Sequence, residues 1–465
     1  MPFWVRQGMI AAALLSMAWP LLADGPGLLQ DIPTDQMTMR DGSVLRGMLL
    51  DESPRGYEFI EINRPPGKPS FAVIHTIGAS QVQRLEKVGG DERRILDDAV
   101  NRLRNHTQIR AAAKESLKLT RVQSDVLETD QAWRYEGDRF TLLSPLDEEL
   151  TRSLAVRADQ IFQAFEHWIP PKQQPQNPIQ IIVFRSIGSY SAYLKTIGLQ
   201  IENPAVYVPH TNQVLIGSDL GLFQQRLDVV QRNHDAVLQQ LDADNKKISG
   251  ELKLLAKRLK DAGWSPNEIA PEVQSMREAW ERDYKKRHSQ IQVTNRRNAT
   301  IKQELLDSTT GFLCHESFHA YIENCVYPQD RYDVPVWLNE GLAQLFEHAQ
   351  FDNGSFRIDL PPAKLLGQLQ DRIERDHGMS LQRMLQTEGG SFLLFENLHG
   401  TRLDYDVAWG LAWYLVFQKQ LFAPNGLQRY VHARDKPQPT IEETFGESVS
   451  RVQSEWVEFI SQLQQ

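Results

Sequence analysis

Two histidines and a glutamate stand at a spacing that suits metal-assisted hydrolysis. The segment 311–321 reads GFLCHESFHAY and holds His315, Glu316 and His319. Residues four apart on a helix share one face, so both imidazoles can hold one metal ion. The Glu316 carboxylate can reach a water on that metal without being a ligand itself. Zinc lowers the pKa of such a water towards ~7, and Glu316 then serves as general base for attack on a carbonyl.

Coincidence is the alternative explanation of this pattern. In a chain with 12 histidines and 60 acidic residues, chance produces it roughly twice per hundred such chains. The context favours a real site, because the apolar residues Phe312, Leu313, Phe318 and Ile322 give the segment the pattern of an amphipathic helix.

A zinc site with two histidines needs a third protein ligand and a position left open for water. The segment 334–343, VPVWLNEGLA, offers Glu340. Pro335 suits the start of a helix, which places Glu340 about one turn into it. Twenty residues separate His319 from Glu340, enough to end one helix and return on a second.

Together, HESFH and WLNEGLA resemble the gluzincin metallopeptidases, which include thermolysin-like proteases and zinc aminopeptidases. More narrowly, residues 135–420 resemble bacterial peptidase-MA-like proteins, many of them known only as domains of unknown function. The resemblance implies a thermolysin-like catalytic domain in which His315, His319 and Glu340 bind zinc and Glu316 is the catalytic acid/base. It also implies that Asn339 supports a ligand histidine. One departure is Gln344, which stands where thermolysin-like members place an Asp and gives a histidine less charge.

Such enzymes also need a donor for the tetrahedral oxyanion. The segment 403–413 resembles the region where related proteins carry a tyrosine, which indicates Tyr405 for this role; a purely structural tyrosine is the alternative, and His399 is the second choice. Glu347 shares a helix face with Glu340, and we expect it beside the ligands or in solvent rather than on the metal.

The remaining sequence predicts an α+β protein with a small β-barrel-like module at its N-terminal end and an all-α C-terminal part. Strand and hairpin patterns, including a hairpin at 205–217, define an α+β layer, and apolar residues at alternating three and four spacing indicate a coiled-coil-like helical hairpin with its tip near 261–267. A hairpin edge beside the zinc would hold an extended peptide as an added strand. The expected parts are a signal peptide (1–23), the β module (30–90), a helical connector (91–130), the α+β layer (132–221), the helical hairpin (222–305), the zinc-binding helices (306–350) and the helical C-terminal subdomain (351–465).

Export is predicted by Arg6, the apolar run 8–22 and the small residue Ala23; an uncleaved anchor is the alternative. The formal net charge of −9 argues against nucleic acid as the main partner. Cys314 and Cys325 are eleven residues apart, about 16 Å along a helix, so we expect no disulfide between them.

The sequence therefore predicts an exported zinc metallopeptidase, periplasmic or extracellular, with one Zn²⁺ per chain and a peptide or protein substrate. The same metal trio would also serve other amides or esters. The alternative from another class is a non-catalytic envelope scaffold, with the helical hairpin or the β module binding a protein partner. The intact Glu316 favours the enzyme, since a relic site has no physical need for that carboxylate.

Overall fold

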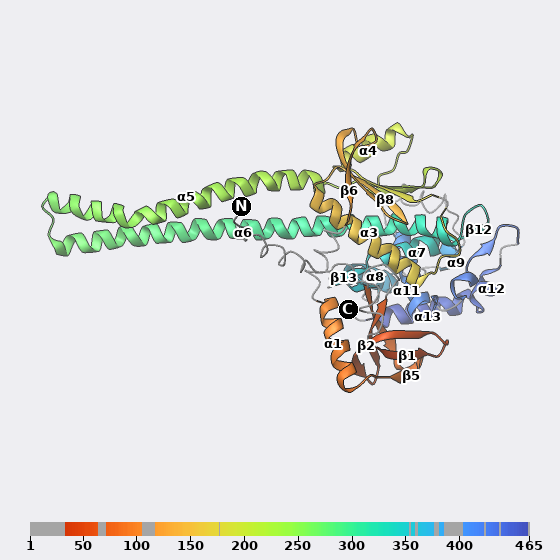
Figure 1. Ribbon diagram of the computed structural model, residues 1–465. Coiled ribbons are helices and arrows are strands. Elements are labelled where there is room, and N and C mark those ends of the chain that lie inside the picture. Colours follow the sequence, from red (N-terminus) through yellow and green to blue (C-terminus); the bar gives the residue numbers. More distant parts are fainter. Residues whose placement is uncertain are drawn as a thin grey trace, which may run out of the picture.

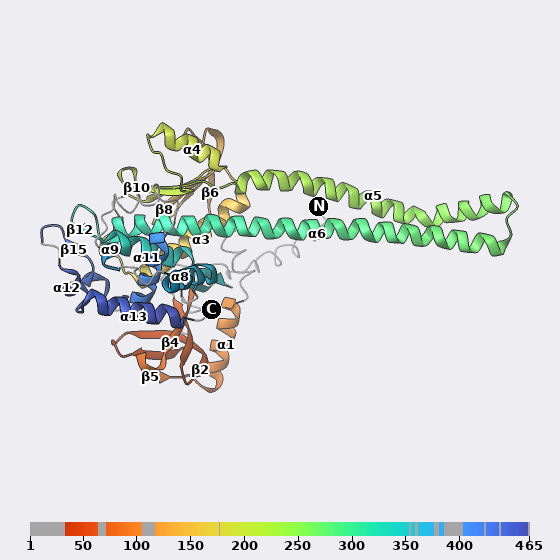
Figure 2. The ribbon, with the colours of Figure 1, turned by 180° about the vertical axis from the view of Figure 1, so that it is seen from behind.

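The computed structural model describes residues 33–463, apart from 64–70, 105–116, 176, 353–354, 359–360, 376–380, 386–402, 423–424 and 437–438. It shows an α+β body, a β module on one side of it and a long helical arm that projects from it (Figures 1 and 2). The expected signal peptide lies outside the described residues. Within the described part, none of the helices combines the length and the apolar character that crossing a membrane requires.

The N-terminal module is an antiparallel sheet built mostly from consecutive hairpins. Its strands are β1 (Asp35–Met39), β2 (Val44–Ser53), β3 (Gly56–Asn63), β4 (Phe71–Gly78) and, after the 3₁₀ turn η1 (Ala79–Gln81), β5 (Val82–Glu86). Two strands from much later in the chain, β13 (Gln350–Asp352) and β14 (Ser355–Arg357), extend it through β4. The order β13-β14-β4-β3-β2-β1-β5 leaves this sheet without closure in the described residues. The module is therefore an open sheet and not a closed barrel, and the C-terminal part is not all-α.

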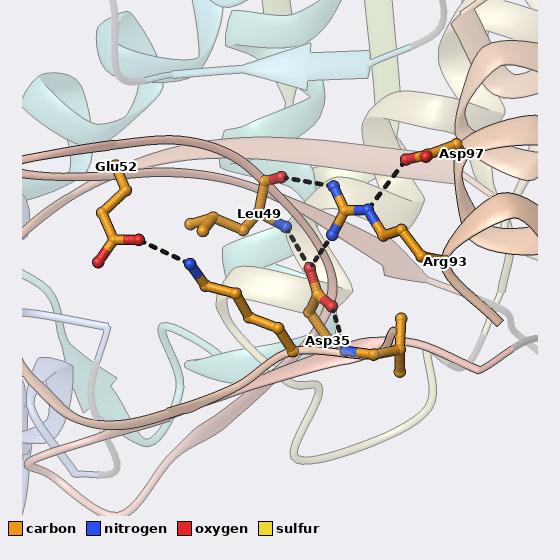
Figure 3. Close-up of polar contacts among 7 residues, drawn as sticks. Asp35, Leu49, Glu52, Arg93 and Asp97 are labelled. Carbon is orange, nitrogen blue, oxygen red and sulfur yellow. Dashed lines mark hydrogen bonds and ion pairs between the residues drawn. The ribbon is translucent and has the colours of Figure 1, made fainter. Parts of the chain in front are cut away.

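A buried carboxylate fastens helix α1 (Gly90–Arg104) to this sheet (Figure 3). Asp35 is fully buried. It accepts hydrogen bonds from the backbone nitrogens of Leu49 (2.8 Å) and Val88 (2.9 Å), and from the Arg93 guanidinium (2.8 Å). Arg93 also donates to the Leu49 carbonyl oxygen (3.2 Å). A buried charge with this many partners orders the junction of strand and helix.

The central sheet runs in the order β10-β11-β9-β8-β7-β6. Its strands are β6 (Leu119–Ser124), β7 (Thr129–Glu136), β8 (Phe140–Ser144), β9 (Ile179–Val183), β10 (Ala205–Val208) and β11 (Gln213–Ile216), the last two joined by the 3₁₀ turn η2 (Pro209–Thr211). The expected helical connector 91–130 is thus wrong from Leu119 onward, where β6 pairs with β7 as the far edge strand. Only one side of β6 is paired and half of its residues are exposed, so its apolar signal is weak.

Helices cover both faces of this sheet, and apolar side chains of β9 are buried on each face. Ile181 and Val183 face the main core with α3 (Glu148–Trp168), whereas Ile182 and Phe184 pack against α4 (Ile187–Thr196). Strands buried on both faces read as continuous apolar runs.

The arm is a helical hairpin of α5 (Leu220–Asp261) and α6 (Pro266–Tyr321), lying side by side in both views (Figures 1 and 2). Its tip falls where the sequence predicts it: Gly263 adopts φ +89°, and Ser265 with Glu268 forms a capping box. Helix α6 runs across the predicted boundary at 305/306 without a break and carries His315 and His319 near its end. At 1.5 Å per residue its 56 residues span about 84 Å.

The C-terminal part contacts α6 through α7 (Val336–Glu347) and gathers around α11 (Leu403–Phe417), which packs against α7. Its elements are the π-turn η3 (Ile322–Val326), α7 (Val336–Glu347), α8 (Ala363–Arg375), α9 (Leu381–Leu385), α11 (Leu403–Phe417), the 3₁₀ turn η4 (Leu427–Arg429), α12 (Ile441–Phe445), α13 (Val449–Gln462) and a two-stranded ladder of β12 (Tyr332–Asp333) with β15 (His432–Ala433). Trp409 and Trp456 are fully buried at its centre. Cys314 and Cys325 are buried free thiols, which confirms the expectation of no disulfide between them.

The β module meets the body at a cluster of Glu61, His75 and His167. Oε2 of Glu61, on β3, lies 2.8 Å from Nε2 of His75 on β4 and 3.0 Å from Nε2 of His167 at the end of α3. Burial opposes ionisation of Glu61, but hydrogen bonds from His167 and His75 outweigh it and lower its pKa to about 2. Trp168 extends the contact, with its ring 5.1 Å from that of His75.

Candidate metal centre

The last turns of α6 and the middle of α7 bring three metal-ligand side chains together. His315 and His319 project from one face of α6, with ring centroids 4.9 Å apart. Nε2 of His315 lies 3.4 Å from Oε2 of Glu340, and Nε2 of His319 lies 3.5 Å from Oε1 of Glu340. All three side chains are only 13–18% exposed. The structure thus brings the three predicted ligands to one point.

The spacing of these atoms is compatible with three ligands around one tetrahedral ion. Tetrahedral ligands at zinc–nitrogen bond lengths of 2.0–2.1 Å lie about 3.4 Å from one another. The His315–Glu340 and His319–Glu340 separations match this value. The other group of potential ligands in the described residues, around Glu61, has both histidine nitrogens at hydrogen-bond distance from one oxygen. That group is therefore best described as a polar contact between the β module and the body.

The outer nitrogen of His315 is held by Glu347. Nδ1 of His315 lies 2.8 Å from Oε2 of Glu347, seven residues after Glu340 on the same helix. With Nε2 bound to a metal, Nδ1 would carry the proton and donate a hydrogen bond to this carboxylate, which would fix the tautomer and the ring orientation. Glu347 thus lies beside the ligand set, and it supplies the carboxylate that the Gln344 position lacks.

His319 has a different environment. In the described residues its Nδ1 is buried without a hydrogen-bond partner, and so is Oδ1 of Asn339. The expected support of a ligand histidine by Asn339 is therefore not present as a hydrogen bond. The two atoms are nevertheless a complementary donor and acceptor once Nε2 of His319 is committed to a metal.

Close packing sets the position of Glu340. Gly341 lies against α11, and a Cβ at this position would lie 2.3 Å from the carbonyl oxygen of Ala408. On the other side, the Cys314 thiol donates to the carbonyl oxygen of Phe346 (3.2 Å), and the rings of Phe318 and Phe346 stack at 5.2 Å. Only a residue without a side chain fits at 341, which is the reason for a glycine directly after the ligand.

The expected general base lies at the edge of the central sheet. Oε2 of Glu316 accepts a hydrogen bond from the backbone nitrogen of Tyr207 (2.7 Å). Tyr207 belongs to β10, which pairs with β11 on one side only. The hairpin at 205–217 therefore lies beside the site, and its unpaired edge points at the Glu316 carboxylate.

Charges within the cluster shift its ionisation equilibria. Burial opposes protonation of His315, but hydrogen bonds to Glu340 and Glu347 raise its pKa well above the usual value. Burial likewise opposes ionisation of Glu340, yet the neighbouring histidines His319 and His315 lower its pKa. These carboxylates are the negative charge that a divalent cation would meet.

A pocket of about 830 Å³ opens beside the cluster, and both His315 and Glu316 line it. Tyr405, at the start of α11, lines the same pocket together with Gln344 and Asp406. Tyr405 thus lines the same cavity as Glu316, the expected general base. His399, the second choice, lies outside the described residues.

The sequence analysis did not specify two hydrogen bonds of the site, from Tyr207 to Glu316 and between His315 and Glu347. The hydrogen bond from Tyr207 depends on pairing across the fold, for which no local pattern exists. The bond of Glu347 to His315 did have a signal, because residues 340 and 347 are two turns apart on one helix face.

A family model described as "Protein of unknown function (DUF1570)" matches residues 309–432. The matched range contains the three potential metal ligands, which are His315, His319 and Glu340. It also contains Glu316, Glu347 and Tyr405. No curated protein and no solved structure matches the chain in the corresponding searches.

Proposed function

We propose that this protein is an exported zinc-dependent metallopeptidase. The observation that carries the proposal is the convergence of His315, His319 and Glu340 at separations of 3.4 and 3.5 Å, which suit tetrahedral zinc. Export rests on the first 23 residues of the sequence. The resemblance of the two motifs to gluzincins supports peptide hydrolysis over other reactions of the same metal trio.

The chain's own residues then have distinct tasks. Zinc held by the trio would lower the pKa of a water towards ~7 and polarise the substrate carbonyl. Glu316 takes the proton of the attacking water and delivers it to the leaving amine. The Tyr405 hydroxyl donates a hydrogen bond to the developing oxyanion. Glu347 keeps His315 in the ligating tautomer.

The edge of β10 offers a place for an extended peptide. Ala205 lines the pocket, and no further strand pairs with the outer side of β10 in the described residues, where the Tyr207 backbone nitrogen donates to Glu316. A peptide added there as a further strand would pass Glu316. This arrangement favours a peptide over a compact ester or amide substrate.

The test compares parent, Glu316→Gln and Tyr405→Phe proteins on a mixture of unstructured peptides, with cleavage followed by mass spectrometry. Loss of a general base costs typically 10²–10⁴ in rate, and loss of an oxyanion donor about 10²–10³. Both variants should retain bound zinc. Glu304→Gln, exposed on the same helix α6, is the matched control and should keep full activity. Full turnover by Glu316→Gln would refute the mechanism.

The exposed apolar residues of the arm favour the alternative function, a non-catalytic scaffold. Both helices are largely exposed, and Leu254, Trp264 and Met276 near the tip have 44–49% of their surface accessible. Such a surface suits a protein partner. A Glu316→Gln strain that shows every phenotype of the parent would favour a scaffold over an enzyme.

A further inference from the structure

We propose that the pocket beside the metal centre binds a carboxylate group of the substrate through the basic face of helix α8. The inference rests on the proposed peptidase function and names its substrate class: peptides that present a negative charge next to the cleaved bond. It is carried by Lys364, Arg372 and Arg375, all of which line the pocket that His315 and Glu316 border.

The basic residues form one face of α8. At about 100° per residue, Lys364, Gln368, Arg372 and Arg375 fall within an arc of roughly 80°, and all four line the pocket. The opposite face is anchored, since Leu366 and Leu369 are fully buried. The helix therefore holds its cationic face towards the cavity.

Helix stability explains only two of the three cations. Cations near a helix C-terminus offset the helix dipole, which accounts for Arg372 and Arg375 in the last turn. Lys364 is the second residue of α8, where a cation opposes the dipole, and the first turn contains no acidic residue. Its place is understandable if the charge serves the pocket.

The pocket is electrically polarised. The acidic side chains that line it come from α6, α7 and α11: Glu316, Glu347 and Asp406. Glu316 already accepts from Tyr207, and Glu347 from His315. The acids of α8 itself, Asp371 and Glu374, are not among the lining residues; Asp371 instead pairs with Arg375 along the helix (3.4 Å). An anionic substrate group is therefore attracted to the α8 wall and repelled from the opposite one.

A peptide offers two sources of a carboxylate, an Asp or Glu side chain and the free C-terminus. Both suit a wall of ammonium and guanidinium groups. Three peptides of one sequence separate them. The first contains Glu and has an amidated C-terminus, the second has Gln in place of Glu with the same amide, and the third has Gln with a free C-terminus.

The experiment measures binding of these peptides by calorimetry to the zinc-loaded full chain carrying Glu316→Gln, so that peptides stay intact. We expect one of the two charged peptides to bind about tenfold tighter than the neutral one, with a preference that falls as salt is raised. Adding Lys364→Gln and Arg372→Gln should bring the ratio close to one. Lys253→Gln with Arg258→Gln, exposed on the arm, removes the same two charges and should leave the preference intact.

Equal affinities for all three peptides, no binding of any peptide, or a preference that survives the loss of Lys364 and Arg372 would each overturn the inference. Hydrolysis by the parent protein is scored separately. If the parent cleaves charged and neutral peptides and the Glu316→Gln protein binds them with equal affinity, the carboxylate site is refuted and the peptidase function stands. Selective binding without cleavage of any peptide would refute the peptidase and keep the carboxylate site.

Discussion

The contact between Gly341 and α11 gives a sharp test of how the fold positions the metal ligands. Replacing Gly341 by alanine adds a Cβ 2.3 Å from the Ala408 carbonyl oxygen and 2.9 Å from the Ala412 side chain. Favourable carbon contacts lie near 3.5 Å, so α7 and α11 must separate by about 1 Å. Glu340 precedes this residue directly and moves with it.

Two effects of known size follow from that shift. Overpacking in a core costs about 1–3 kcal/mol, which lowers the Tm by about 2–12 °C for a unit of this size. Metal sites tolerate distance errors of only about 0.2 Å, so the affinity for zinc should fall by about tenfold or more. A second glycine provides the control: Gly250 lies exposed inside helix α5, and an added Cβ there meets nothing within 4 Å.

Thermal unfolding of metal-free protein measures the first effect, and competition with a chromogenic chelator measures the second. Gly250→Ala should keep the parent zinc affinity and raise helix stability by about 0.5–1 kcal/mol, because alanine loses less chain entropy than glycine. Retention of both the parent Tm and the parent zinc affinity by Gly341→Ala, or equal behaviour of the two alanine variants, would show that this contact does not position Glu340.

Two further predictions concern the β module. Asp35→Ala leaves the backbone nitrogens of Leu49 and Val88 without their acceptor, while Arg93 keeps its ion pair with Asp97. It should destabilise the protein by about 2–4 kcal/mol in urea unfolding; a loss below ~1 kcal/mol would contradict the role given to this carboxylate. Glu61 has its pKa lowered from 4.5 to about 2 in the folded state, so its stabilising effect is present above pH ~4.5 and is lost as the pH falls towards 2. Glu61→Gln should therefore lower the free energy of unfolding by up to about 3 kcal/mol at pH 7. The difference in unfolding free energy between the variant and the parent should shrink as the pH falls. A difference that stays constant from pH 7 to pH 3 would show that the charge of Glu61 is not what stabilises the contact with His75 and His167.

Local chemistry made the centre predictable from the sequence. The four-residue spacing of His315 and His319 places them on one helix face in any fold, and Pro335 marks the start of the helix that carries Glu340. The hairpin tip was equally local, since a glycine with positive φ and a Ser-Glu capping box act over a few residues. Such signals survive without knowledge of the tertiary structure.

Non-local pairing set the limit of prediction. Strands β13 and β14 are only three residues long, and β14 joins the sheet by pairing with β4, more than 280 residues earlier. The continuity of α6 was hidden for a different reason: the helical pattern of the seam and that of the motif run together between residues 305 and 315, and no proline or turn separates them. The helix that carries His315 and His319 is consequently the end of the arm itself.

The most direct test of the central claim is the zinc content of the purified protein. Elemental analysis of the parent, His319→Ala and a control, His234→Ala on the arm, should give about one zinc per chain in the parent and the control and none in His319→Ala. Glu316→Gln should also retain the metal, because its carboxylate is not one of the three converging ligands. Absence of zinc from the parent after reconstitution at neutral pH, or an equal zinc content in His319→Ala, would contradict the assignment of His315, His319 and Glu340 as a metal centre.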